Sequence, residues 1–326
     1  MHAQKLTQGL SAVLREENII MGMHTTFSTR RKTLITAAGV LTTVGGFAAT
    51  TIPASAAEDT GTILAAGLRG ANEVSAGDRD GAALQFVKVD GDKVSVAVQW
   101  RGTDKPTALH IHQGAKGTNG DVKIDFTKLL GGKGKGRSVT GTVEVKDAAL
   151  LDALKTDPNS FYANLHTAEF PGGAVRGQLH KVTVASFDFR DALDNFQASV
   201  VKGKQIYECK PTEGGGHAFA QRDVSAVLDG RIAHSFVKPN SGTPQWIAPD
   251  GSAVTGAVIS RTPNGDGNIP ELDLKATQSG KHHGLLAGTA EILRLNTVGG
   301  VAPAGSCSPG TIVGVPYQAD YVFVRS

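Results

Sequence analysis

Residues 82–100 alternate between apolar and polar or small side chains on both sides of an Asp90-Gly91 pair. A period of two is typical of a β-strand with one buried face, and Asp-Gly supplies the positive φ that a tight hairpin turn needs. The pattern therefore predicts an antiparallel hairpin with one face in a core. Its apolar positions are Leu84 and Phe86 before the turn, and Val94, Val96, Val98 and Trp100 after it.

Further segments of strand character surround this hairpin, and Gly, Asp, Asn and Pro separate them. We expect strands at residues 63–68, 108–112, 138–145, 161–167 and 174–180. One helix is predicted at residues 147–155, because Asp147 can cap its start and Leu150, Leu151 and Leu154 form an apolar stripe. About seven short strands in some 120 residues are typical of an antiparallel β-sandwich.

The second half of the chain also shows short segments of strand character separated by turn residues. Strands are predicted at residues 205–209, 253–259, 272–276, 290–295 and 317–324. The chain is therefore predicted to be all-β with two domains, a sandwich at 57–182 and a β-rich domain at 204–326, with a joint at 183–203. Cys209 and Cys307 are the only cysteines. In an exported protein this predicts one disulfide within the second domain.

Residues 1–56 are interpreted as an export signal. Arg30, Arg31 and Lys32 precede a weakly apolar stretch, and Ala54-Ser55-Ala56 resembles a signal cleavage site. Glu16 and Glu17 suit a leader poorly, so translation is expected to start at Met21 or Met23. The paired arginines resemble a twin-arginine signal, although Thr33 departs from that motif, and the general secretory route stays open. A membrane anchor is the alternative, but glycines and threonines dilute the apolar stretch.

Composition and net charge limit which kinds of binding partner the protein can be expected to have. Hydrophobic residues make up 40% and charged residues 19% of the 326, which excludes a charge-rich disordered chain. The formal charge is +3, but removing five of the 33 basic and two of the 30 acidic residues with the leader leaves 28 of each. The mature chain is therefore formally neutral, so the sequence favours neither a nucleic-acid partner nor a transmembrane segment. We expect a secreted protein with an extracellular or cell-envelope partner of unknown identity.

Three histidines are the one group of residues whose pattern suggests a metal-binding site. His110 and His112 stand at i and i+2 of a predicted strand, so both imidazoles lie on one face about 7 Å apart. His166 on a separate strand can complete a site for copper or zinc. The alternative is structural: the imidazoles bond to backbone carbonyls or to neighbours such as Asn164 and lock the strands together.

Three other features bear on this site. Copper-zinc superoxide dismutases also place a His-x-His pair on a sandwich strand, but adding His180 does not complete their ligand set. Glu73 and Arg176 are expected to form a structural ion pair. His282-His283 lies among Gly and Lys residues, which indicates an exposed loop rather than a site.

Four motifs in the first domain resemble the CHRD family, named from chordin. They begin at Leu68, Leu109, Phe161 and Phe170, and read LRGANEV, LHIHQG, FYANLHT and FPGGAVRGQL. The resemblance covers residues 60–181 and implies an immunoglobulin-like or superoxide-dismutase-like sandwich in an extracellular protein, without a characteristic activity. Residues 195–326 are similar to a family of secreted bacterial and fungal proteins of unknown function, through motifs that include Tyr207-Glu208-Cys209 and Ile269-Pro270-Glu271-Leu272.

Motifs of familiar enzymes do not occur in the sequence: there is no G-x-S-x-G elbow, H-E-x-x-H helix or P-loop. The favoured hypothesis is a secreted, noncatalytic binding or scaffolding protein. The alternative is a copper- or zinc-binding protein that uses His110, His112 and His166.

Overall fold

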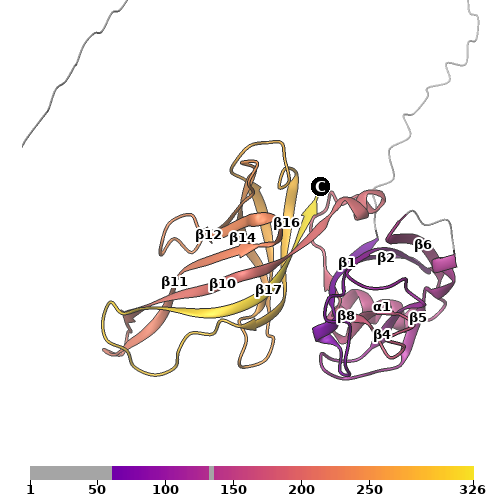
Figure 1. The fold of residues 1–326 in the computed structure, drawn as a ribbon, viewed down its shortest axis with the longest axis horizontal. Coiled ribbons are helices and arrows are strands. Elements are labelled where there is room, and N and C mark those ends of the chain that lie inside the picture. Colours follow the sequence, from indigo (N-terminus) through magenta and orange to yellow (C-terminus); the bar gives the residue numbers. More distant parts are fainter. Residues whose placement is uncertain (1–60, 132–135) are drawn as a thin grey trace, which may run out of the picture. The chain divides into compact units, whose positions relative to one another are not determined.

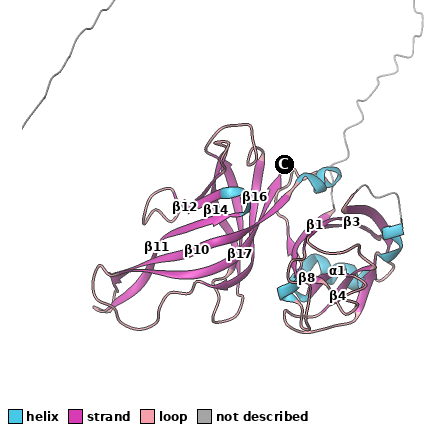
Figure 2. Cartoon of the chain, in the orientation of Figure 1, coloured by secondary structure: helices cyan, strands magenta, loops and turns pink. Residues whose placement is uncertain are grey.

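The structure is a computed structural model that describes residues 61–131 and 136–326 (Figure 1). The expected export signal and its cleavage site lie outside these residues. The described residues all belong to one compact unit, and β-strands dominate it (Figure 2). The all-β fold class with antiparallel sheets is confirmed. No helix of the described residues is long and apolar enough to cross a membrane.

Nine strands form the first sheet, hydrogen-bonded in the order β5-β4-β7-β8-β1-β2-β3-β6, with β9 paired to β1. Leu109 and Ile111 of β4 pack in the same core as Val87 of β2 and Val96 of β3, so the two ends of this order cover one apolar interior. The strands are β1 (Thr62–Arg69), β2 (Ala82–Asp90), β3 (Lys93–Arg101), β4 (Ala108–Gln113), β5 (Val122–Asp125), β6 (Ser138–Glu144), β7 (Phe161–His166), β8 (Val175–Gln178) and β9 (His180–Lys181).

The β2–β3 hairpin has the expected turn, with Asp90 opposite Lys93 and Gly91 at φ 58°. Its faces differ from the prediction. Leu84 and Phe86 share a face with Ala97, opposite to the core face of Val94, Val96 and Val98. Both faces of β2 are buried, because Leu84 and Phe86 pack with residues of the second domain such as Leu293. The expectation of a single buried face was therefore wrong for this strand.

The one α-helix of the described residues, α1 (Ala148–Thr156), occurs where the sequence predicts it. The Asp147 carboxylate accepts a hydrogen bond from the Leu150 N–H at 3.0 Å, and Leu151 and Leu154 are buried in the core. Short 3-10 helices complete the irregular connections: η1 (Gly70–Asn72), η2 (Thr127–Gly131), η3 (Pro158–Ser160), η4 (Phe189–Asp194) and η5 (Asp229–Arg231).

The second half is a closed barrel in which each strand pairs with its neighbour in sequence and β17 returns to pair with β10. Inward side chains such as Val254, Ile292 and Phe323 fill its core. Its strands are β10 (Phe196–Pro211), β11 (His217–Leu228), β12 (Ile232–Phe236), β13 (Pro244–Ile247), β14 (Ala253–Thr262), β15 (Glu271–Gln278), β16 (Thr289–Gly299) and β17 (Ile312–Arg325).

The barrel contains the expected disulfide. Cys209 of β10 is bonded to Cys307 across 98 residues, which confirms the pairing. The Cys209 N–H also donates to the Thr311 carbonyl at 2.8 Å, so the β16–β17 connection is attached to β10 where the barrel closes. Strand β10 begins at Phe196, inside the segment 183–203 that the sequence suggests as a joint.

Candidate metal centre

The three candidate histidines come together on neighbouring strands. His110 and His112 alternate with buried Leu109 and Ile111 on β4, and His166 ends β7. In the β4–β7 register His110 lies opposite Asn164 and His166 lies opposite Ala108, so His110 and His166 are diagonal neighbours. One nitrogen from each imidazole lies within 4.8 Å of the other two. The three histidines that the sequence suggests for a shared site thus lie close together.

The closest approach joins His110 Nδ1 to His166 Nε2 at 3.2 Å. Two nitrogens bound to one tetrahedral ion at about 2.0–2.1 Å lie roughly 3.3 Å apart, which this pair matches. The ring centroids of His110 and His112 are 5.4 Å apart, and those of His112 and His166 are 6.1 Å apart. His112 is therefore the ring that has to approach the other two for a common ion.

The second nitrogen of each ring has its own partner. His112 Nδ1 lies 3.0 Å from the Gly120 carbonyl, and His166 Nδ1 lies 3.0 Å from the Pro171 carbonyl. A carbonyl only accepts, so both rings donate from Nδ1 and keep a lone pair on Nε2. His110 Nε2 lies 3.4 Å from a carboxylate oxygen of Asp125. Such partners orient the histidines of known metal sites.

His112 has a buried ring nitrogen that is free to act as a ligand. Its Nε2 is buried and has no hydrogen-bond partner among the described residues. Burial is also the main reason why the pKa values of His110, His112 and His166 are lowered, so the three rings favour the neutral form that binds metal ions. Three neutral imidazoles with converging lone pairs are suited to a cation of intermediate softness.

An aromatic and cationic wall holds His112 in place. Its ring is stacked on Tyr162 with centroids 4.8 Å apart and planes at 5°, and the Arg176 guanidinium lies 3.4 Å from the centre of the Tyr162 ring. Arg176 also donates to the Ala115 carbonyl at 3.0 Å. The expected ion pair with Glu73 is not formed. Burial raises the pKa of Glu73 to about 7, and Arg176 opposes that shift only through its more distant charge.

Comparison with protein families agrees with the two halves of the fold. Residues 64–179 match the family model of the CHRD domain, and residues 225–325 match that of Protein of unknown function (DUF3455). The chain carries a CHRD domain followed by a DUF3455 domain. No curated protein and no solved structure gives a significant match. The two families are compatible with a noncatalytic binding protein, and the disulfide is compatible with an extracellular one.

The other candidate histidines lie outside the triad formed by His110, His112 and His166. His180 Nε2 lies 3.2 Å from a Glu271 carboxylate oxygen, so it has a different partner. His282 and His283 are exposed, as the surrounding glycines indicate. No motif of the sequence assigns His234 to a site, and the structure buries it inside the barrel at 4% exposure. Its signal was present: it occupies an inward position of β12, two residues after buried Ile232.

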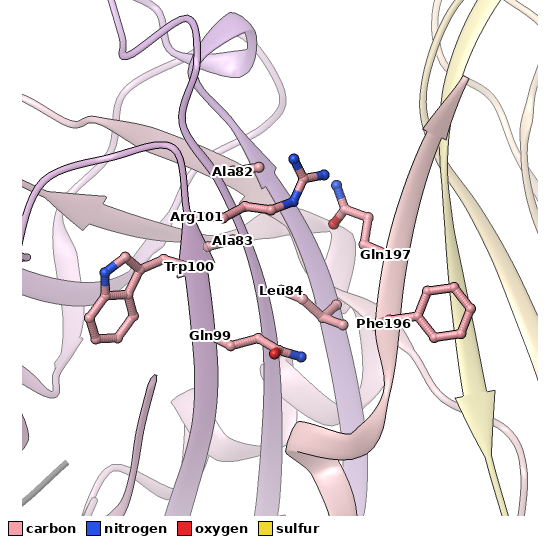
Figure 3. Close-up of a pocket in the computed structure, with 8 residues that line it drawn as sticks. All are labelled: Ala82, Ala83, Leu84, Gln99, Trp100, Arg101, Phe196 and Gln197. Atoms are coloured by element: carbon pink, nitrogen blue, oxygen red, sulfur yellow. The ribbon is translucent and has the colours of Figure 1, made fainter. Parts of the chain in front are cut away.

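A cavity of about 270 Å³ lies beside the CHRD hairpin, lined by residues of β2, β3 and β10 (Figure 3). Arg101 is the one ionisable side chain among its eight lining residues, and it lies 3.3 Å from the Asp229 carboxylate. Since no second titratable group lines this cavity, it offers no acid–base pair.

Proposed function

We propose that this chain is an exported, noncatalytic protein whose CHRD domain binds one copper or zinc ion through His110, His112 and His166. The observation that carries the proposal is the convergence of three imidazole nitrogens within 4.8 Å. The unpartnered Nε2 of His112 supports it, because an unsatisfied buried acceptor is unfavourable by about 1–3 kcal/mol.

The donor set favours copper and zinc over calcium or magnesium. Imidazole nitrogen suits zinc and copper, whereas calcium and magnesium prefer oxygen. The ligand atoms are His110 Nδ1, His112 Nε2 and His166 Nε2, since the opposite nitrogen of each ring has a hydrogen-bonding or ionic partner. Three protein ligands leave one tetrahedral position for a further ligand.

The alternative function is a scaffold without metal. It is supported by the 3.2 Å contact between His110 Nδ1 and His166 Nε2, which can be a hydrogen bond. His110 can carry a proton on Nδ1 and donate it to His166 Nε2, while His110 Nε2 accepts from the Thr127 hydroxyl at 3.3 Å. This network ties β4 to β7 without an ion. It leaves His112 Nε2 unpaired, however, and for that reason we favour the metal.

Export and absence of catalysis complete the proposal. The leader-like residues 1–56 and the disulfide support an extracellular location, by the twin-arginine or the general secretory route. The sequence contains no familiar catalytic motif, which supports binding rather than turnover.

Metal analysis of the purified protein tests the site. After incubation with copper or zinc and dialysis, we expect about one bound ion per chain, measured by plasma mass spectrometry. The double substitution His110→Ala/His112→Ala is expected to abolish this binding. His282→Ala/His283→Ala removes two exposed histidines outside the triad and serves as the matched control, which should keep the ion. Equal, substoichiometric metal in all three proteins would refute the proposal.

A further inference from the structure

The barrel contains a cavity of its own, separate from the histidine triad. Its volume is about 80 Å³, room for about three water molecules at the density of the liquid. Inward side chains of the barrel strands form the deep wall, and the exposed Arg261 and Val258 stand among the lining residues. The deep polar and aromatic residues are Gln205, His234, Trp246, Arg294 and Tyr321.

Arg294 occupies a position where the strand pattern calls for an apolar side chain. Along β16, Ile292 packs in the barrel core, whereas Leu293 and Leu295 pack in a different apolar cluster. Alternation therefore directs Arg294 inward with Ile292, and its residue exposure is 9%. One terminal nitrogen donates to the Pro270 carbonyl at 2.7 Å, but Nε has no partner.

No carboxylate of the described residues forms an ion pair with Arg294. A guanidinium is always protonated at physiological pH, and an uncompensated buried charge is strongly unfavourable. The barrel thus holds a buried positive charge that lacks a counter-ion from the described part of the chain.

Two further donors in the same wall are unused. Trp246 Nε1 and Gln205 Nε2 are buried without partners, and each of these side chains belongs to a residue only 1% exposed. The amide of Gln205 is oriented, because its oxygen accepts from Gln221 Nε2 at 2.7 Å. The unsatisfied groups of Gln205, Trp246 and Arg294 are all donors, so the ligand that would complete them is an acceptor.

The deep wall also contains three stacked or edge-on aromatic rings, which add no charge. His234 is stacked on Trp246 with centroids 4.4 Å apart and planes at 4°, and Tyr321 meets both rings edge-on at 5.1 and 5.5 Å. His234 donates from Nδ1 to the Gln245 carbonyl at 2.9 Å. Burial lowers the pKa of His234 to about 3, so the ring is neutral at physiological pH.

We propose that the barrel binds a small organic carboxylate with a flat, apolar body. The carboxylate would accept from the Arg294 guanidinium and from the unused donors of Trp246 and Gln205. The body would lie against the aromatic wall, where flat rings stack favourably. The size of the cavity restricts the enclosed part to a few heavy atoms, so a larger ligand would extend toward Arg261.

Tryptophan fluorescence provides a direct test, because Trp100 and Trp246 are the only tryptophans. In full-length protein with Trp100→Phe, all tryptophan signal comes from the cavity wall. Titration with benzoate is expected to change this signal saturably, with a dissociation constant of ~1 mM or lower. Benzamide, which has the same shape without the charge, should bind at least ~10-fold more weakly.

Substitutions then test whether Arg294 supplies the positive charge that binds benzoate. Arg294→Gln is expected to weaken benzoate binding at least ~10-fold, whereas Arg231→Gln, at an exposed position, should leave it unchanged. Circular dichroism checks that each variant is folded. If Arg294→Gln does not fold, Arg294→Lys and Gln205→Leu replace it, each with weaker binding expected.

Three results would overturn the proposal: no saturable signal with benzoate, equal affinity for benzamide, or unchanged benzoate affinity in the folded cavity variants. Stronger binding of inorganic phosphate than of benzoate would also contradict it, since phosphate has no apolar body for the aromatic wall.

Discussion

His112 in the CHRD domain and His234 in the barrel are held in nearly the same way. Each stacks flat on an aromatic ring, His112 on Tyr162 at 5° and His234 on Trp246 at 4°. Each also has Nδ1 within 3.0 Å of a backbone carbonyl, from Gly120 or Gln245. Burial lowers the pKa of both. The local arrangement of the ring therefore does not distinguish the two sites.

Their neighbours do distinguish them. His112 faces two more neutral imidazoles, so lone pairs converge and the surroundings suit a cation. His234 lies in a cavity with a guanidinium and unused N–H donors, so its surroundings suit an anion. The comparison teaches that a buried histidine says little about the ligand, and that the charges and donors around it decide the sign of what binds.

The two regions also differ in how they are held together, and the disulfide lies in the barrel alone. We expect Cys209→Ala/Cys307→Ala to lower the free energy of unfolding of the barrel by up to about 4–5 kcal/mol, because the bond closes a loop of 98 residues. Urea unfolding measures the loss, with Trp246 as the barrel reporter in a Trp100→Phe background.

The same cysteine pair in a Trp246→Phe background follows the CHRD domain through Trp100, which packs against its core. A much smaller shift is expected there. Equal shifts of the two reporters would show that both regions unfold as one unit and would contradict a stabilisation confined to the barrel.

Both regions contain carboxyl groups with raised pKa values: half-buried Glu73 in the CHRD domain, and the buried neighbours Glu291 and Asp273 in the barrel. Burial, together with the neighbouring Asp273 carboxylate, raises the pKa of Glu291 to about 8, while burial raises the pKa of Glu73 in the CHRD domain to about 7. Both glutamates therefore hold more protons in the folded state than in the unfolded state, up to about pH 8 for Glu291. The buried histidines, whose pKa values are lowered, hold fewer protons in the folded state up to about pH 6.5 and oppose this effect. Between pH 7 and 8, where the histidines contribute little, stability should fall as the pH rises, by on the order of 1 kcal/mol.

Denaturant unfolding at several pH values measures this slope. Glu291→Gln removes the titrating group at nearly constant volume and should flatten the slope more than Glu73→Gln does. A slope that is unchanged in Glu291→Gln would contradict the assignment. A rise of stability between pH 7 and 8 in the parent protein would contradict the direction of the Glu291 shift itself.

The sequence predicted that His110, His112 and His166 could form a site, but it did not predict the cavity in the barrel. The reason is physical. The i, i+2 spacing of His110 and His112 fixes a shared face within one strand, and the motif around His166 indicates a second strand. Arg294 and Trp246 are far apart in sequence and meet only because the barrel closes. Closure depends on strand pairing over long separations, such as β10 with β17, which no local pattern encodes.

The faces of the β2–β3 hairpin show the same limit. The pattern predicts alternation, and alternation occurs, but Leu84 and Phe86 lie on the face away from the CHRD core. Periodicity reveals which residues share a face, whereas the neighbour that covers that face comes from another part of the chain. Helix α1 and the disulfide were predictable, because a cap with an apolar stripe and a lone pair of cysteines are nearly complete signals.

The smallest expected effect concerns α1, which has no counterpart among the described residues of the barrel. Asp147→Ala removes the side chain that accepts from the Leu150 N–H at 3.0 Å. The loss should lower the stability of the CHRD domain by about 1 kcal/mol. Unfolding followed by Trp100 in the Trp246→Phe background measures it. Asp152→Ala is the control on the same helix, since its exposed ion pair with Lys155 at 2.9 Å contributes only about 0.3–0.5 kcal/mol. An equal loss in both variants would show that the charge of the helix, and not its cap, stabilises this element.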